Sequence, residues 1–240
     1  MNPKTFGLAA AAIGLLCVAR ARSADENAGA LPERIVALAK TVTADDYAFT
    51  RTARVEEIQA DKTETHVTLE KFDPRKPVEQ RWTLLEVDGR APTADELKAH
   101  RKEAPKRRVA HYGRVANYFG SPSTTSTGQA GRIVFRFTQL PKESLVVTNA
   151  DLSSSAVAEA TVDTTAAVPF VERVQFTLTK PTRLMVVAKV EQLEATTRYR
   201  MLPDGKPVPV EQVSEMSGSM LGKSGQIKTV LTYTDYTRAR

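Results

Sequence analysis

Cysteine and histidine are scarce in this chain, and their scarcity limits its chemistry. One cysteine in 240 residues excludes a disulfide framework and a cysteine-based zinc cluster. His66, His100 and His111 are the three histidines, and their spacing does not suit a metal site. Glu64, His66 and Glu70 lie on one strand face, which we interpret as solvated. We therefore expect neither a metal nor a cofactor.

Nucleophile and phosphate motifs are also missing. The chain has no G-x-S-x-G elbow. Residues 218–224 resemble a P-loop, but three residues separate the glycines where the motif needs four, and a β pattern follows instead of a helix. We interpret residues 222–225 as a hairpin turn. The sequence predicts that the protein is not an enzyme, although an active site assembled from scattered residues stays open as an alternative.

The overall composition is that of a folded domain. Hydrophobic residues make up 41% of the chain and charged residues 26%, which excludes a disordered chain and an ordinary multi-span membrane protein. The length suits one domain with a sizeable core.

The first residues carry the pattern of a secretory signal peptide. Lys4 precedes an apolar run from Phe6 to Ala19, and residues 19–21 form an A-x-A cleavage site. The run is shorter than the roughly 20 residues of a membrane span. We predict a signal peptide over 1–21, with cleavage between 21 and 24, and one domain over 22–240. Cys17 lacks a correctly placed lipobox leucine, so we expect a periplasmic protein without a lipid anchor.

The positive charge is local. The formal net charge is +6, but two of the cations, Lys4 and Arg20, lie in the predicted signal peptide. Residues 98–114, which we name the basic segment, contain seven Lys or Arg and one acidic residue. The rest of the mature chain is slightly acidic.

Hydrophobic periodicity predicts two helices. Leu31, Ile35, Leu38 and Val42 recur at helical spacing, with Pro32 in the first turn. Residues 93–103 begin with a Thr93–Glu96 capping box and carry few large apolar residues.

Alternation with a period of two predicts about nine or ten strands. They are expected at 47–58, 65–72, 80–87, 131–140, within 144–164, at 170–179, in a long run at 184–202 that must bend, and in two further segments after a turn at 203–206. A flexible polar loop is expected at 121–131. The predicted fold class is mainly β (α+β), a curled antiparallel sheet or unclosed barrel around an N-terminal and a mid-chain helix.

This order of elements resembles the bacterial lipoprotein-carrier superfamily (LolA/LolB-like). Residues 72–103 and 216–238 also look like uncharacterised exported proteins of Gram-negative bacteria. The resemblance covers roughly Leu31 to the C-terminus. It implies a half-barrel wrapped around helices, with an apolar concavity that takes up acyl chains or protein partners.

Two functions follow as expectations. The first is binding of a lipid, an acylated protein or another apolar ligand in the concave face, with Trp82, Phe135, Phe137 and Phe176 as the candidate lining. The second is an envelope interaction or scaffold protein that contacts an anionic membrane surface or an acidic protein. Its candidate contacts are cations of the basic segment: Lys98, Arg101, Lys102, Lys106, Arg107 and Arg108. Such charge runs are also common on solvated helix faces. We expect no nucleic-acid partner.

Overall fold

The computed structural model describes residues 30–60, 62–147, 150–185, 188–220 and 223–239. The predicted signal peptide lies outside the described residues. Among the residues that are described, none of the helices has the length and apolar character that a membrane crossing requires.

Strands dominate the structure, as the alternating sequence pattern predicts. The N-terminal strands are β1 (Tyr47–Gln59), β2 (Lys62–Phe72) and β3 (Trp82–Val87). The middle strands are β4 (Thr124–Thr127), β5 (Arg132–Phe137), β6 (Val146–Val147), β7 (Ala150–Asp151), β8 (Ala156–Asp163) and β9 (Phe170–Leu178). The C-terminal strands are β10 (Thr182–Met185), β11 (Ala188–Met201), β12 (Pro207–Met220) and β13 (Lys223–Arg238).

One 11-stranded antiparallel sheet contains all of these strands except β6 and β7. Its order is β3-β2-β1-β13-β12-β11-β9-β8-β5-β4, with β10 paired to β11. The first and last long strands are neighbours, and Tyr47 pairs with Arg238. The sheet does not close, because β3 and β4 lie at its two opposite edges. The predicted fold class, a curled and unclosed antiparallel sheet with few helices, is confirmed.

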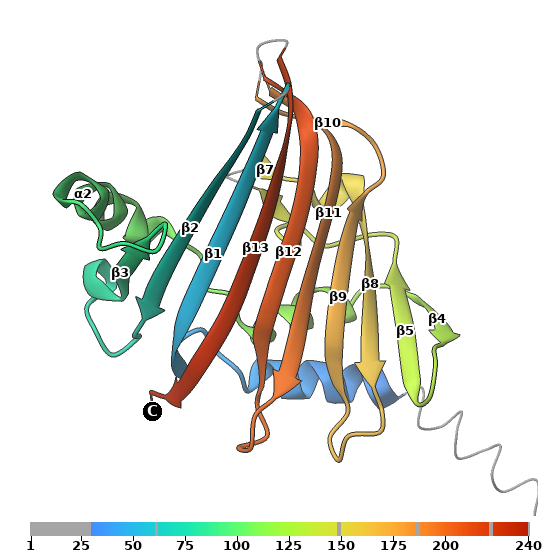
Figure 1. Ribbon diagram of the computed structural model, residues 1–240. Helices are drawn as coiled ribbons and strands as arrows, with labels where there is room; N and C mark the ends of the chain where they lie inside the picture. Colours follow the sequence, from blue (N-terminus) through green and yellow to red (C-terminus); the bar gives the residue numbers. More distant parts are fainter. Residues whose placement is uncertain (1–29, 61, 148–149, 186–187, 221–222, 240) are drawn as a thin grey trace, which may run out of the picture.

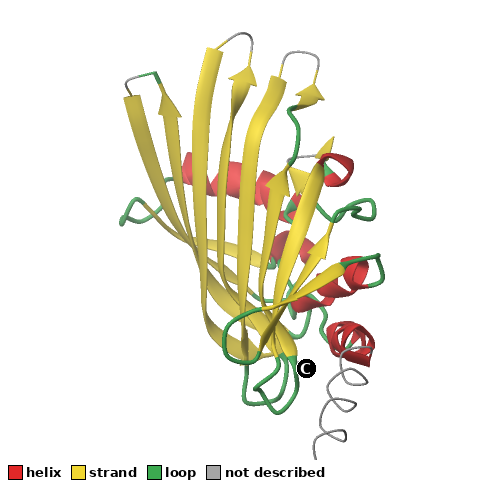
Figure 2. Ribbon diagram, turned by 90° about the vertical axis from the view of Figure 1, so that its right-hand side faces the viewer, coloured by secondary structure: helices red, strands yellow, loops and turns green. Residues whose placement is uncertain are grey.

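The N-terminal helix over residues 30–40 and the short α3 (Ala116–Phe119) lie on one side of the sheet, inside its curl (Figure 2). The third helix is α2 (Ala94–Glu103). In Figure 1 the N-terminal helix crosses behind the lower ends of the strands, and α2 lies beyond β3 at the outer margin. The predicted capping box is present: the Thr93 hydroxyl accepts from the Glu96 backbone, and the Glu96 carboxylate accepts from the Thr93 backbone.

A segment that we name the strap (residues 104–120) runs from α2 across the concave face. It contains the single turns η2 (Ala104–Lys106) and η3 (Tyr112–Val115) and ends with α3. Its side chains Tyr112, Val115, Tyr118 and Phe119 are buried. They join the N-terminal helix and the inward face of β5, β8 and β9 in one hydrophobic core. The strap is therefore a packed part of the fold.

Alternating burial shows how the sheet contributes to this core. In β8 every second residue is buried, namely Ala156, Ala158, Ala160 and Val162, as expected for a strand with one face toward the core. A second cluster holds Phe49, Phe72, Trp82, Ala104 and Tyr233 at the β3 side of the molecule.

Three local predictions from the sequence are wrong. Residues 184–202 do not form one bent strand, because β10 folds back and pairs with β11. The expected loop at 121–131 contains edge strand β4, whose threonines suit a short exposed strand. β12 and β13 pair as the expected hairpin, but its turn does not extend over 222–225, because residues 223–225 belong to β13 and pair with β12; residue 222 lies outside the described residues.

Candidate functional site

A cavity of about 250 Å³ lies between the strap and the concave face of the sheet, and we name it the concave cavity. Arg108, His111, Arg114 and Tyr118 of the strap form one wall. Leu145, from the segment before β6, also contributes. Two of these side chains are cationic, so the strap wall offers positive charge beside apolar surface.

The opposite wall belongs to the sheet. It includes Phe176 of β9, then Ala195, Thr197 and Tyr199 of β11, and Gln212 of β12. The β11 residues alternate along the strand and so share one face. A small alanine between larger neighbours leaves the space that the cavity occupies.

The concave face continues beyond the cavity. Gln212 pairs with Leu231 of β13, which pairs with Ala53 of β1. Directly paired residues share a face of the sheet, so Leu231 and Ala53 face the same side as the cavity wall. Both are half-buried. Small and apolar side chains thus extend from the cavity across the central strands.

The four aromatic residues proposed from the sequence lie in three different places. Phe176 lines the concave cavity. Phe135 and Phe137 are 2% and 1% exposed and belong to the core beneath the strap. Trp82 belongs to the second cluster, near the sheet edge. The structure brings Phe135 and Phe137 together, and Tyr118 links this pair to Phe176 through edge-to-face contacts.

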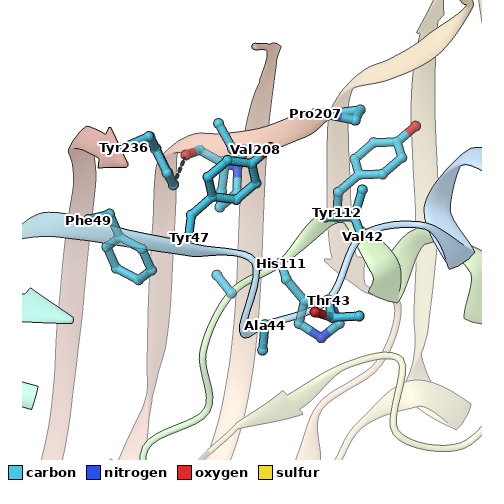
Figure 3. Close-up of a pocket in the computed structure, with 12 residues that line it drawn as sticks. Val42, Thr43, Ala44, Tyr47, Phe49, His111, Tyr112, Pro207, Val208 and Tyr236 are labelled. Carbon is cyan, nitrogen blue, oxygen red and sulfur yellow. Dashed lines mark hydrogen bonds between the residues drawn. The ribbon is translucent and has the colours of Figure 1, made fainter. Parts of the chain in front are cut away.

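A smaller pocket lies where the strap meets the loop after the N-terminal helix (Figure 3). Its volume of about 10 Å³ is the size of one water molecule. His111 lines both this pocket and the concave cavity. Its Nδ1 is buried without a hydrogen-bond partner among the described residues. Burial, and then the charge of Arg114, lower the pKa of His111, so its imidazole is neutral near pH 7.

The most buried charged group in the described structure lies elsewhere, on β2. Glu70 is 1% exposed and accepts hydrogen bonds from Arg51 of β1 and Arg107 of the strap. Nε2 of His100, on α2, lies 2.9 Å from Oε1 of Glu70. The guanidinium carbon of Arg51 lies 4.1 Å from the ring centroid of Trp82, a cation–π contact. We name Glu70, Arg51, His100 and Arg107 the Glu70 cluster.

The Glu70 cluster is strongly coupled electrostatically. Burial alone raises the pKa of Glu70, but the hydrogen bond with His100 and the charges of Arg51 and Arg107 outweigh burial and hold the pKa at about 2. The carboxylate is therefore ionised at neutral pH. It ties α2 and the strap to the sheet, because it contacts His100 of α2, Arg107 of the strap and Arg51 of β1.

A larger groove lies beside this cluster, between β3 and α2, and we name it the edge groove. Its volume is about 520 Å³. Trp82, Thr83 and Leu84 of β3 form one wall, and Leu97, His100 and Arg101 of α2 form the other, with residues 76–80 at one end. The α2 residues are spaced i, i+3 and i+4, so they lie on one face of the helix.

The pairing of His100 with Glu70 resembles an imidazole oriented for general base catalysis. Here, however, Oε1 of Glu70 also accepts from Arg107, and Thr83 has the one hydroxyl group among the residues that line the edge groove. An activated nucleophile needs a hydroxyl or thiol within hydrogen-bond reach of the base, and the structure records no bond between Thr83 and His100. The contacts of Glu70 with His100 and Arg107 therefore fit a structural role, in which they hold α2 and the strap against the sheet.

The cations of the basic segment do not form one uniform surface. Arg107 points inward to Glu70, and Lys106 pairs with Glu103 at 3.1 Å. Arg114 is half-buried and donates to the backbone oxygen of Glu143. The other four are exposed, and the ion pairs found among the described residues do not include them; they are Lys98, Arg101, Lys102 and Arg108. Arg101 lines the edge groove and Arg108 the concave cavity.

Sequence reasoning missed the Glu70 cluster because it assigned Glu70 to a solvated strand face. That interpretation holds for Glu64 and His66, which are exposed, and is wrong for Glu70. Phe72 could have indicated this burial. It lies two residues after Glu70, on the same face of the strand, and a phenylalanine there predicts that this end of the face is buried.

Comparison with known proteins gives a distant structural likeness. No protein-family profile and no curated protein sequence matches the chain. Among solved structures, a LolA superfamily protein from Nitrosomonas europaea is similar over 89% of this chain and 93% of its own. The identity is 10% and the TM-score 0.34. A likeness at this level assigns neither a family nor a function.

Proposed function

We propose that the mature chain is a periplasmic, non-enzymatic protein that binds the acyl chain of a lipid or of an acylated protein in the concave cavity. The cavity itself carries this proposal, because it combines a partly apolar sheet wall that includes Phe176 and Tyr199 with two arginines on the strap wall. Such a wall accepts a hydrocarbon chain and a neighbouring anionic group.

The size of the concave cavity limits the ligand. Its 250 Å³ is below the roughly 300–1,000 Å³ of sites that enclose drug-sized molecules. A single chain segment fits better than a whole lipid. The remainder of the ligand would lie along the half-buried concave face that passes through Leu231 and Ala53.

A fluorescent fatty acid, cis-parinaric acid, tests the proposal in titrations of the mature chain (residues 22–240). We expect saturable binding, and we expect Ala195→Phe to weaken it at least about tenfold, about 1.4 kcal/mol, because the larger side chain fills the cavity. Thr196→Phe is the matched control, since Thr196 faces the opposite side of the same strand. Circular dichroism shows whether both variants fold.

Absence of saturable binding by the wild-type chain, or equal affinity in the Ala195→Phe variant, contradicts the proposal. Competition separates the two sources of the acyl chain. Displacement by palmitate alone indicates a lipid, and stronger displacement by a palmitoylated peptide indicates an acylated protein.

A further inference from the structure

We propose that the edge groove binds an extended acidic segment of a partner protein, which adds as a strand to β3. This site is separate from the concave cavity, and the proposal does not depend on binding of an acyl ligand. It rests on an available strand edge, on the place of the groove along that edge, and on the charge around it.

The edge of β3 is available for pairing. In the sheet order β3 is terminal and pairs with β2 alone. Its last residue, Val87, exchanges backbone hydrogen bonds of 2.9 and 3.0 Å with Arg90, which covers that end. The stretch from Trp82 to Glu86 pairs with no second strand among the described residues, and an uncovered edge is a template for an added strand.

The edge groove reaches the edge of β3 as well as its concave face. Trp82, Thr83 and Leu84 are consecutive in the strand, so their side chains alternate between the two faces. All three line the groove, and a groove that touches both faces lies at the edge between them. Leu97 and His100 of α2 face it from the other side. An added strand would therefore have β3 on one side and a helix on the other.

Charge selects an acidic occupant. Lys76 and Arg101 line the edge groove, and Glu79 is its acidic residue. Lys98 and Lys102 add two exposed cations on α2, against the exposed Asp95 of the same helix and Glu86 of β3. Opposite charge around an interface favours association with a complementary partner and disfavours others.

The other terminal strand, β4, also lacks a second neighbour in the sheet, but it is shorter than β3 and carries no charge. β4 is four residues long, and all four are exposed threonines or serine. Strand addition in protein complexes draws affinity from backbone hydrogen bonds and specificity from side-chain pockets, and β3 offers both.

The single tryptophan of the sequence allows a direct measurement. Trp82 lines the groove, so its emission reports occupancy. We expect the hexapeptide acetyl-Glu-Val-Glu-Val-Glu-Val-amide to change this emission saturably, and more weakly at high salt. We expect a Lys-Val peptide of equal length to leave it unchanged. Arg101→Glu should weaken binding at least about tenfold, whereas Lys180→Glu, at an exposed turn distant in sequence, should not.

Two N-methylated forms of the acidic peptide test the mode of binding. A strand that pairs along one edge uses alternate amides, so methylation of one alternate set should abolish binding and methylation of the other should preserve it. Equal effects of both sets, or no binding of the acidic peptide, overturn the proposal. Vesicles of phosphatidylglycerol are tested in parallel. If the protein binds these vesicles but not the peptide, and Arg101→Glu abolishes vesicle binding, the groove contacts a membrane and the proposal is overturned.

Discussion

Replacing Glu70 with glutamine should strongly destabilise the protein. The substitution keeps the size of the side chain but leaves the guanidinium groups of Arg51 and Arg107 without their carboxylate. Breaking a buried ion pair by removing one partner costs about 3–5 kcal/mol. The side chain of Arg107 is 30% exposed and can turn toward water, whereas that of Arg51 is 12% exposed. We therefore expect a loss near the lower limit, about 3 kcal/mol.

The pKa of Glu70 leads to a similar magnitude. A drop from 4.5 to about 2 corresponds to about 3 kcal/mol at neutral pH. The folded-state pKa is depressed, so this stabilisation is present above pH 4.5 and is lost as the pH falls toward 2. The wild-type free energy of unfolding should decrease over this window, and Glu70→Gln should lack that component of the decrease.

Urea unfolding at pH 7 and at pH 3, followed by circular dichroism, measures both effects. A loss of about 3 kcal/mol lowers the melting temperature by about 6–12 °C in a domain of this size. Glu159→Gln is the control, because its pair with Arg136 is exposed and contributes at most about 1 kcal/mol. A Glu70→Gln variant that loses less than about 1 kcal/mol, or that keeps the wild-type acid dependence, refutes the reasoning.

Two further substitutions test the packing of the strap. Tyr112→Phe removes the acceptor of the buried Val171 N–H, whose nitrogen lies 2.9 Å from the tyrosine oxygen. Urea unfolding should show that the free energy of unfolding falls by about 1–3 kcal/mol. An unchanged midpoint would argue against this hydrogen bond. Gly113→Ala would place a Cβ 2.3 Å from the carbonyl oxygen of Val42 and should cost about 1–3 kcal/mol. Gly120→Ala, where nothing lies within 4 Å, should change the melting temperature little, and equal effects of the two alanines would contradict the close contact.

Local patterns in the sequence predicted the fold class and most element bounds. The Thr93–Glu96 capping box and the alternation in β1 depend on neighbouring residues, so they can be recognised without tertiary information. The reversal between β10 and β11 could not be recognised in this way. The sequence has neither proline nor glycine between Thr182 and Met201 to mark a turn, and pairing determines where the chain turns back.

The candidate sites were harder to predict because they depend on contacts between distant elements. The basic segment was found as a charge run, but composition does not reveal that Arg107 faces a buried carboxylate while Arg101 faces a groove. Phe135 and Phe176 have similar strand patterns. Their different surroundings follow from where the strap crosses the sheet.

The pairing of β1 with β13 sets the order in which the sheet can be completed. These strands lie near opposite ends of the described chain. Contacts so distant in sequence form slowly, because loop closure must precede them. At about 5–20 residues per second, β13 is synthesised roughly 10–40 s after β1. Throughout that interval one side of β1 has no native neighbour, so the nascent protein carries an unpaired strand in the middle of its future sheet.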